Sequence, residues 1–507
     1  MGPCRKRKDK AMKKTLEKKV VADELLDMDG AIELLKTTRP TFYRWLRSGK
    51  LKGLKVGRQW RFEKNDIERF LKGQEPRIEL PTDITPLVRT LAKQVQEITQ
   101  KKPDMAGDDG VVNAVNLMIL LGIHWGASDI HLTTHMKHGG EVEGVLRYRV
   151  DGVLHIATTF DARLMPAIAQ RWKTLASCDI RQNIQPQDGR IMFPVNGGKK
   201  AIDIRVNFLP ALLGEGVTAR LLDADRVVLT LDAIDYAPRD KQKILEYLNG
   251  PWGIIVFTGP TGSGKTTAMY ASLNKIAKPE DKIMSVEDPV EIYLPWVTQV
   301  PVRPNHGVTF ATTLRAILRS DPDVIMVNEI RDSESLAVTQ EASLTGHLIL
   351  TALHTADAPS ALIRLIEICG EPFVAADSTK LIVAQRLVRK LCPECAVADN
   401  PSAEMLVEAE RLAKAGGIDW NGLDKHFKKP VGCEKCRKTG YRGRTVVAEV
   451  LEVTPAIGAA MRKKASEDEL REIAVRQGMT TIAADGIRRA AAGETSLQEV
   501  FRTLGLQ

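Results

Sequence analysis

Blocks of apolar residues alternate with amphipathic stretches in the second half of the chain, and their lengths predict the elements there. Gly253–Thr258 is a short apolar run, which is typical of a fully buried strand. Thr267–Ala277, after the turn that follows, has a helix pattern, and strand and helix patterns then alternate through residues 240–391. This order is typical of a parallel sheet covered by helices, so we predict an α/β core.

Residues 110–225 show a different mixture of patterns. One apolar helix pattern, Val111–Gly126, is followed by strands of alternating polarity such as Val145–Val150 and Ala201–Phe208. Upstream of them, prolines surround one polar helix pattern near Ile84–Thr99, which is typical of a linker. We therefore predict a second α/β domain that is preceded by a linker.

Residues 21–75 predict a small module of helices around one hairpin. Asp29 and Thr38 can cap two successive helices, and Phe42 and Leu46 share one face of the second helix. The expected elements are a helix from Asp29 to about Lys36, a helix from Thr38 to Gly49, strands Leu51–Val56 and Gln59–Phe62, and a helix Asp66–Leu71 capped by Asn65.

These patterns divide the chain into seven segments and predict a multidomain α/β protein. The segments are a basic tail (1–20), the small helical module (21–75), the linker (76–109), the upstream α/β domain (110–225), the parallel core (226–391), a cysteine-containing segment (392–445) and a helical C-terminal region (446–507).

Positive charge is concentrated at the start of the chain. The net charge is +9, and residues 1–20 hold nine Lys or Arg against two acids. Such a tail can contact nucleic acid or anionic lipid, or it can be solvated without a partner. No apolar run reaches the roughly 18 residues that a membrane helix needs, and the basic N-terminus lacks the apolar stretch of a secretory signal. We therefore expect a cytoplasmic protein that reaches membranes through partners.

A glycine-rich turn follows the apolar strand and predicts a phosphate-binding loop. It fits the pattern G-x-x-x-x-G-K-[ST], in which glycines let backbone N–H groups surround phosphates at a helix N-terminus. Lys265 can reach the β- and γ-phosphates, and Thr266 can bind Mg²⁺. The predicted nucleotide-binding residues are Gly259, Pro260, Thr261, Gly262, Ser263, Gly264, Lys265, Thr266 and Thr267.

Two later strands end in acids, and a third is flanked by histidines. The strand pattern Ile283–Val286 leads to Glu287, and the next apolar run leads to Glu329. Acids at strand ends after a phosphate loop are the arrangement of a Walker B carboxylate, which helps to hold Mg²⁺ and its water. His347 and His354 flank the third strand, and they could sense the γ-phosphate or be structural.

Four of the seven cysteines form two C-x-x-C pairs that are separated by 37 residues. Each pair can supply half of a tetrahedral four-sulfur zinc site. Because no signal peptide is predicted, metal binding is favoured over disulfides, and reduced thiols without metal are the alternative. The predicted zinc ligands are Cys392, Cys395, Cys433 and Cys436.

Together these segments resemble the motor ATPases of type II secretion and type IV pilus assembly. The stretches GPTGSGKTT, SVEDPVE, LRAILRSDPDVIMVNEIRD and TGHLILTALHT occur in the family's order. Upstream, ASDIHL, LRYRVDG, QDGRI and DIRVNFLPALLGEGVTARLL resemble its second N-terminal domain, and the cysteine pairs resemble its zinc subdomain. The resemblance covers residues 110–507 and implies a RecA-like P-loop ATPase core that uses ATP, Mg²⁺ and zinc.

The resemblance also implies roles and partners. It implies a homo-hexamer beneath an inner-membrane platform, in which Glu287 activates the attacking water and Glu329 supports Mg²⁺. It implies that Arg205 and Arg220 reach toward the phosphates, where positive charge stabilises phosphoryl transfer, although each could instead form a surface ion pair. The family usually has Gly before the Walker B glutamate, and here Asn328 could crowd that acid or hydrogen-bond to it.

The N-terminal module resembles the winged helix-turn-helix of excisionase and MerR-type regulators through TRPTFYRWLRSGKLKGLKVGRQWRF. In such DNA binders the second helix enters the major groove and the wing touches the backbone. Thr41 and Arg44 would then face bases of duplex DNA, and Arg58 and Arg61 would meet phosphates. Because a winged fold can also dock a protein, both kinds of partner stay open.

Three functions remain open from the sequence. The first is a hexameric motor that hydrolyses ATP to assemble a secretion pseudopilus or a type IV pilus. The second is a DNA-binding regulator with an ATP-dependent switch core. The third is an adaptor that binds ATP but turns over slowly because of Asn328.

Overall fold

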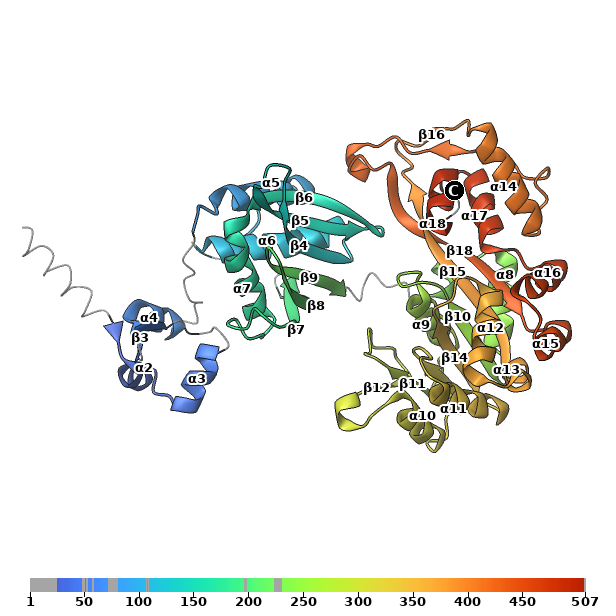
Figure 1. Cartoon of the computed structure of the whole chain (residues 1–507), viewed down its shortest axis with the longest axis horizontal. Helices are drawn as coiled ribbons and strands as arrows, with labels where there is room; N and C mark the ends of the chain where they lie inside the picture. Colours follow the sequence, from blue (N-terminus) through green and yellow to red (C-terminus); the bar gives the residue numbers. More distant parts are fainter. Residues whose placement is uncertain are drawn as a thin grey trace, which may run out of the picture. The chain divides into compact units, whose positions relative to one another are not determined.

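The computed structural model describes residues 25–47, 51, 53–56, 59–71, 81–105, 107, 109–195, 198–222 and 230–505. The predicted basic tail lies outside the described residues. The chain divides into two compact units, Met1–Asp223 and Ala224–Gln507, and each contains both helices and strands (Figure 1). Within the described ranges, no helix combines the length and the apolarity needed to cross a membrane.

A small helical module opens the first unit. Its elements are β1 (Leu25–Leu26), α2 (Met28–Leu34), α3 (Arg39–Arg47), β2 (Leu54–Val56), β3 (Gln59–Glu63) and α4 (Lys64–Leu71). The order of two helices, a hairpin and a helix is as predicted, and Phe42 of α3 packs edge-on against Phe62 of β3. Two predicted caps are wrong: Asp27 rather than Asp29 caps α2, and Asn65 lies inside α4.

The upstream α/β domain is an antiparallel sheet covered by helices. Its elements are α6 (Gly110–Trp125), β4 (Asp129–Met136), β5 (Val142–Val150), β6 (Val153–Asp161), α7 (Met165–Leu175), β7 (Gln187–Val195), β8 (Lys200–Ala211) and β9 (Gly214–Leu222). The strand order is β6-β5-β4-β9-β8-β7. Alternate residues of the strands, such as Ile204 and Val206 of β8, are buried in one core with Leu117 of α6 and Trp172 of α7. The opposite face of these strands carries polar side chains together with exposed apolar ones such as Ile156 and Leu209.

The helix predicted near Ile84–Thr99 exists, but it does not belong to a linker. It is α5 (Thr85–Thr99), and it buries Leu87, Leu91 and Val95 in the same core as α6. Its polar residues occupy the other face, which is why its average composition suggested an exposed segment. Helix α5 therefore packs with this domain, although it precedes the predicted boundary at residue 110.

A seven-stranded sheet forms the centre of the second unit, in the order β12-β11-β13-β14-β10-β15-β18. The first six strands in this order are mutually parallel, and β18 is antiparallel to β15. The strands are β10 (Gly253–Thr258), β11 (Ile283–Glu287), β12 (Val297–Pro301), β13 (Val324–Val327), β14 (Leu348–Leu353), β15 (Thr379–Leu391) and β18 (Tyr441–Glu452). Every residue of β10, β13 and β14 is buried, which explains why these strands appear as continuous apolar runs.

Helices cover both faces of this sheet. They are α8 (Pro238–Leu248), α9 (Lys265–Ile276), α10 (Phe310–Leu318), α11 (Ser333–Leu344), α12 (Ala358–Cys369) and α13 (Pro372–Ser378). Ile255 of β10 belongs to one core with α8 and α9, and its neighbour Ile254 belongs to another core with α10, α11 and α12. The predicted parallel α/β core is confirmed.

The last two predicted segments do not separate as expected. Strand β18 crosses the boundary at residue 445 and completes the central sheet. The cysteine-containing segment holds α14 (Ala403–Ala415), and the C-terminal helices are α15 (Pro455–Arg462), α16 (Glu467–Arg476), α17 (Ile482–Ala491) and α18 (Leu497–Leu504). Trp420, which follows α14, shares a core with Ile487 of α17 and Val500 of α18. The cysteine-containing segment is thus packed onto the C-terminal helices.

Glu499 of α18 joins this helix to the central sheet. Its side chain is fully buried and accepts hydrogen bonds from Arg389 of β15 at 2.6 Å and from Arg502 at 2.7 Å. Burial alone would raise the pKa of Glu499, but the two arginines outweigh it and lower that pKa to about 2. An acid with a lowered pKa stabilises the fold above its unfolded pKa, and this contribution is lost as the pH falls toward its folded pKa.

We expect Glu499→Gln to lower the free energy of unfolding at pH 7 by up to about 3 kcal/mol, because one pKa unit corresponds to about 1.4 kcal/mol. The gap between wild type and variant should close as the pH falls from about 4.5 to about 2. Urea unfolding at a series of pH values measures this difference in the free energy of unfolding. Glu472→Gln, which alters an exposed ion pair on α16, is the control and should change little. A gap that does not vary with pH would contradict the assignment.

Candidate functional site

The glycine-rich loop connects the buried strand β10 to the helix α9. Gly259 and Gly264 have φ angles of +145° and +91°, which only glycine adopts without strain. A Cβ atom on Gly259 would lie 2.4 Å from the backbone oxygen of Gln385 on β15, so space also requires glycine there. The side chain of Gln385 donates to the Ser263 carbonyl at 2.9 Å. Strand β15 therefore supports the loop directly, a contact that sequence patterns did not reveal.

Lys265, the first residue of α9, is only 8% exposed. Its Nζ donates to the carbonyls of Gly259 at 2.8 Å and Pro260 at 3.1 Å, and it lies 3.5 Å from Nδ1 of His354. Burial lowers the pKa of Lys265, and the nearby charge of Glu329 raises it. The ammonium group is thus held inside the loop, at the helix N-terminus where anions bind.

Glu329 lies in a charged environment beside this lysine. Its Oε2 pairs with Nε2 of His354 at 2.8 Å, and its Oε1 accepts a hydrogen bond from Arg331. Burial alone would raise the pKa of Glu329, but the bonds from His354 and Arg331 outweigh it and lower that pKa. The hydrogen bond between Asn328 and this acid, which the sequence left open, is not among those formed by the described residues. The structure thus brings Lys265, Glu329 and His354 together.

Glu287 is also near α9, but its surroundings are neutral. The carboxylate is fully buried and accepts hydrogen bonds from Tyr270, from Ser285 at 2.5 Å and from Gln299 at 2.9 Å. Sequence patterns missed all three partners. The position of Tyr270, one helical turn after Thr266, is the signal that could have found it.

His347 lies at the amino end of the parallel strands, opposite to the end that carries the glycine-rich loop. It precedes the amino end of β14, whereas His354 follows the carboxyl end. Six strand residues span about 20 Å, so His347 is far from the loop of its own chain. Its Nδ1 contacts the carbonyl oxygen of Ala342 at 2.9 Å, as expected of a structural histidine. Within one chain, the geometry gives no support to γ-phosphate sensing by His347.

Arg205 and Arg220 lie on the outer face of the antiparallel sheet in the first unit. Arg220 of β9 stands directly opposite Arg205 of β8 and Asp129 of β4. Since directly opposite residues share a face, these three side chains belong to one row. Arg220 bonds to Asp129 at 3.1 Å and is 60% exposed, so it forms an ion pair at a surface open to solvent.

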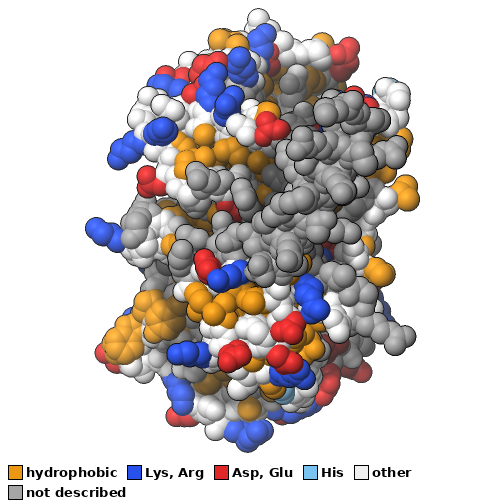
Figure 2. Space-filling view, turned by 90° about the vertical axis from the view of Figure 1, so that its left-hand side faces the viewer, with side chains coloured by type: hydrophobic (Ala, Val, Ile, Leu, Met, Phe, Trp, Pro, Cys, Tyr) orange, Lys and Arg blue, Asp and Glu red, His pale blue; other side chains and the backbone are white. Residues whose placement is uncertain are grey.

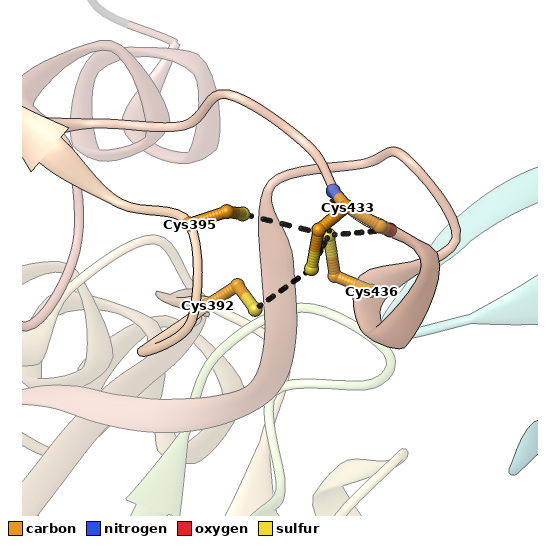
Figure 3. A group of neighbouring side chains, drawn as sticks. All are labelled: Cys392, Cys395, Cys433 and Cys436. Carbon is orange, nitrogen blue, oxygen red and sulfur yellow. Dashed lines mark hydrogen bonds between the residues drawn. The ribbon is translucent and has the colours of Figure 1, made fainter.

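The four predicted cysteine ligands converge at one point, where two loops face each other (Figure 3). All four sulfur atoms lie within 4.8 Å of one another, and the Cys392–Cys433, Cys395–Cys436 and Cys433–Cys436 distances are 3.9, 3.8 and 3.7 Å. A tetrahedral site with Zn–S bonds of about 2.3 Å has sulfurs about 3.8 Å apart. The residues therefore fit zinc.

Backbone donors around these sulfurs favour the thiolate form that binds metal. Gly432 donates to Cys395 at 3.4 Å, and Cys433 and Gly440 donate to Cys436 at 3.1 and 3.2 Å. Burial would raise the pKa of Cys436, but the donors Cys433 and Gly440 and the neighbouring thiols lower it, whereas burial raises the pKa of Cys395, so Cys436 is the more readily ionised of these two thiols. Bound zinc would hold the two knuckles together, which fits a structural site.

Two of the residues predicted to bind DNA are exposed or half-buried on α3. Arg44 is exposed, and Thr41 accepts a hydrogen bond from Thr38 at 3.0 Å. Arg61 on β3 donates to Gln59 at 2.9 Å, and Arg58 lies outside the described residues. On the face drawn in Figure 2, Lys and Arg side chains are interspersed with acids and with small hydrophobic patches.

A strand, a glycine-rich loop and a helix, with an acid and a histidine from other strands of the same parallel sheet, define a RecA-like P-loop nucleotide-binding core. Residues 85–502 match the family described as "Type II/IV secretion system protein", and residues 25–75 match "Helix-turn-helix domain". The chain belongs to the type II/IV secretion system protein family.

Similar proteins cover most of the chain. Type II secretion system protein E of Aeromonas hydrophila is 39% identical over 409 residues, which are 80% of this chain and 78% of that protein. The type IV pilus assembly ATPase PilB of Pseudomonas aeruginosa is 40% identical over 80% of this chain and 69% of its own length. The solved structure of the ATPase DotB from Legionella pneumophila has a TM-score of 0.58 and covers 80% of this chain and 98% of DotB at 20% identity, which supports the fold.

We expect the purified chain to hold about one zinc ion, as a four-sulfur site does. Cys433→Ser should lose the zinc and lower the thermal unfolding midpoint, because metal-binding free energy contributes to folding. Metal analysis and calorimetry measure both effects. Cys369→Ser, which lies outside the cluster, is the matched control. Metal-free wild type with an unchanged midpoint after chelation would contradict the assignment.

Proposed function

We propose that this chain is a Mg²⁺-dependent ATPase that drives assembly of a type II secretion pseudopilus or a type IV pilus. Membership of the secretion family supports the biological role. One observation carries the chemistry: Lys265, inside a glycine-rich loop, lies beside Glu329 and His354 from other strands of the same sheet. A loop, a lysine and an acid in this arrangement bind a nucleoside triphosphate with its metal.

Each residue of the loop region has a proposed role. Backbone N–H groups of the loop and Lys265 bind the phosphates, and the hydroxyl of Thr266 and the carboxylate of Glu329 hold Mg²⁺ with its water. His354, paired with Glu329, is placed to report whether the γ-phosphate is present. Bound Mg²⁺ supplies charge neutralisation at the phosphates.

Glu287 is proposed as the general base for the attacking water. Because its carboxylate is fully buried, we propose that the turn after β11 shifts to admit this water. Closing motions of this kind are common in phosphoryl-transfer enzymes, because they assemble the site only when substrate is bound.

We further propose that the chain works as a homo-hexamer. In a ring, Arg205 and Arg220 could supply positive charge to the phosphates, once Arg220 leaves Asp129. His347 would act only if it meets the site of another subunit. Inner-membrane platform proteins are the proposed partners, and the ATPase would be cytoplasmic and held at the membrane through them.

The N-terminal module is proposed to bind a partner of its own. The match to a helix-turn-helix domain, together with the exposed Arg44 on the second helix, favours duplex DNA. A docking protein of the secretion or pilus system is the other candidate, since a winged fold serves both purposes.

We expect steady ATP hydrolysis that requires Mg²⁺ and does not require DNA. Lys265→Ala should weaken ATP binding by roughly tenfold to a hundredfold through loss of a charged hydrogen bond. Glu287→Gln should lower kcat by about a hundredfold or more while ATP still binds, as removal of a general base does. Equilibrium binding of a fluorescent ATP analogue and phosphate-release kinetics measure these effects. Absence of Mg²⁺-dependent nucleotide binding by wild type would refute the proposed function.

The slow-adaptor alternative is tested by Asn328→Gly. If Asn328 restricts Glu329, this substitution should raise kcat several-fold. An unchanged kcat would exclude the adaptor hypothesis and would leave the motor hypothesis in place.

For the N-terminal module, we expect duplex DNA binding whose affinity falls with salt, with a slope set by the number of phosphate contacts. Arg44→Ala and Arg61→Ala should each weaken binding by about tenfold. Fluorescence anisotropy of the intact chain over a range of salt concentrations measures this. Arg89→Ala, on the exposed side of α5, is the control. If all variants bind duplex DNA with the same affinity, and if this affinity does not change with salt, the protein-docking alternative is favoured.

A further inference from the structure

The carboxylate of Glu287 is buried, and in the part of the chain that the structure describes its hydrogen bonds come from uncharged side chains. It is fully buried, and its three partners, Tyr270, Ser285 and Gln299, are all uncharged donors. A buried carboxylate without a cation is costly unless hydrogen bonds replace the lost water. These donors therefore determine where the charge sits and which way its oxygens point.

The three donors come from different elements. Ser285 is on β11 with Glu287 itself, and Gln299 is on the neighbouring edge strand β12. Tyr270 alone among them comes from α9, the helix that begins with Lys265. It is therefore the partner that ties this acid to the phosphate-binding helix.

Tyr270 lies one helical turn after Thr266, the proposed Mg²⁺ ligand. It follows Thr266 by four residues in α9, so the two side chains lie on one helix face about 6 Å apart along the axis. The geometry thus places Tyr270, which holds Glu287, one helical turn after Thr266, whose hydroxyl is proposed to bind the metal. A movement of the N-terminal turn of α9 would be passed to Glu287 through this tyrosine.

The same hydroxyl also fixes the turn that follows the acid. Tyr270 donates to Glu287 and accepts a hydrogen bond from the backbone N–H of Glu291 at 3.1 Å. Gln299 holds the next part of this turn, accepting from the N–H of Leu294 at 2.8 Å. Burial, and then the charge of Glu287, raise the pKa of Tyr270, so its hydroxyl stays protonated and remains a donor.

We propose that Tyr270 is a positioning residue for hydrolysis, which sets the location of the Glu287 carboxylate relative to the phosphates and Mg²⁺ bound at the N-terminus of α9. This inference rests on the proposed function, in which Glu287 is the base. Tyr270 acts through Glu287 and contacts no substrate. Its effect therefore belongs to the chemical step, and binding of ATP depends on the loop alone.

The test is a double-mutant cycle in the full chain with Tyr270→Phe and Glu287→Gln. Tyr270→Phe keeps the ring and removes the hydroxyl, and it should lower kcat about tenfold or more, the usual value of a hydrogen bond to a charged group. KM and the affinity for fluorescent ATP should stay within about twofold, since the loop is intact. In the Glu287→Gln background, Tyr270→Phe should have little further effect. Single-turnover phosphate release is sensitive enough for the slow variants.

Tyr247→Phe is the matched control, because Tyr247 on α8 also lies close to a glutamate, Glu452, away from the loop, and Glu452 contributes to raising its pKa. It should leave kcat unchanged. Thermal unfolding midpoints of all variants separate loss of fold from loss of positioning, and Ser285→Ala, which removes another donor to the same carboxylate, should lower kcat in the same way.

Each outcome decides between the two proposals. If Glu287→Gln does not slow hydrolysis, the proposed role of Glu287 fails, and the inference fails with it. If Glu287→Gln slows hydrolysis but Tyr270→Phe leaves kcat unchanged, the inference alone is overturned. It is also overturned if Tyr270→Phe slows the Glu287→Gln variant as much as wild type, or weakens ATP binding as much as it lowers kcat.

Discussion

The parallel hydrogen bonding of β10 with β14 and β15 is the constraint on which the candidate site depends. Because the strands are parallel, Thr258 and Leu353, the last residues of β10 and β14, lie side by side with Ala384 of β15 at the carboxyl end of the strands. The glycine-rich loop and His354 follow immediately after these strand ends. Open α/β sheets bind ligands at this edge, because connections from several strands meet there. A register shift of β14 against β10 would separate Lys265 from His354, and a shift of β15 would move Gln385 away from the loop.

The two acids at this edge differ in environment, and the difference suggests separate roles. Glu329 has hydrogen bonds to His354 and Arg331, which lower its pKa, and Lys265 lies close to the same histidine. Glu287 is buried, and Tyr270 and Gln299 donate hydrogen bonds to it. A charged, partly accessible acid suits metal support, whereas an acid held ready by neutral hydrogen bonds suits proton transfer. The two glutamates thus have different chemical properties because the residues around them differ.

Burial of apolar surface explains why the segments of this chain merge into fewer units than sequence patterns suggest. Helix α5 and the segment around α14 are each too small to form a core, so each packs onto a neighbour. The cysteine cluster has a similar effect, since zinc bound there would hold together two loops that are far apart in the sequence. Glu499 and Arg389 then join the last helix to the central sheet.

The sequence by itself determined the features that depend on local order. Fully buried strands appear as apolar runs, the loop needs glycines and a lysine at fixed spacing, and two cysteine pairs define a zinc site; these follow from residues close together in the chain. Tertiary structure decided which distant residues meet. It placed Tyr270 on Glu287, Gln385 on the loop, Asp129 beside Arg220, and His347 away from the site. Pairing between strands and the burial of a helix face depend on contacts between residues far apart in sequence, and no local pattern records those contacts.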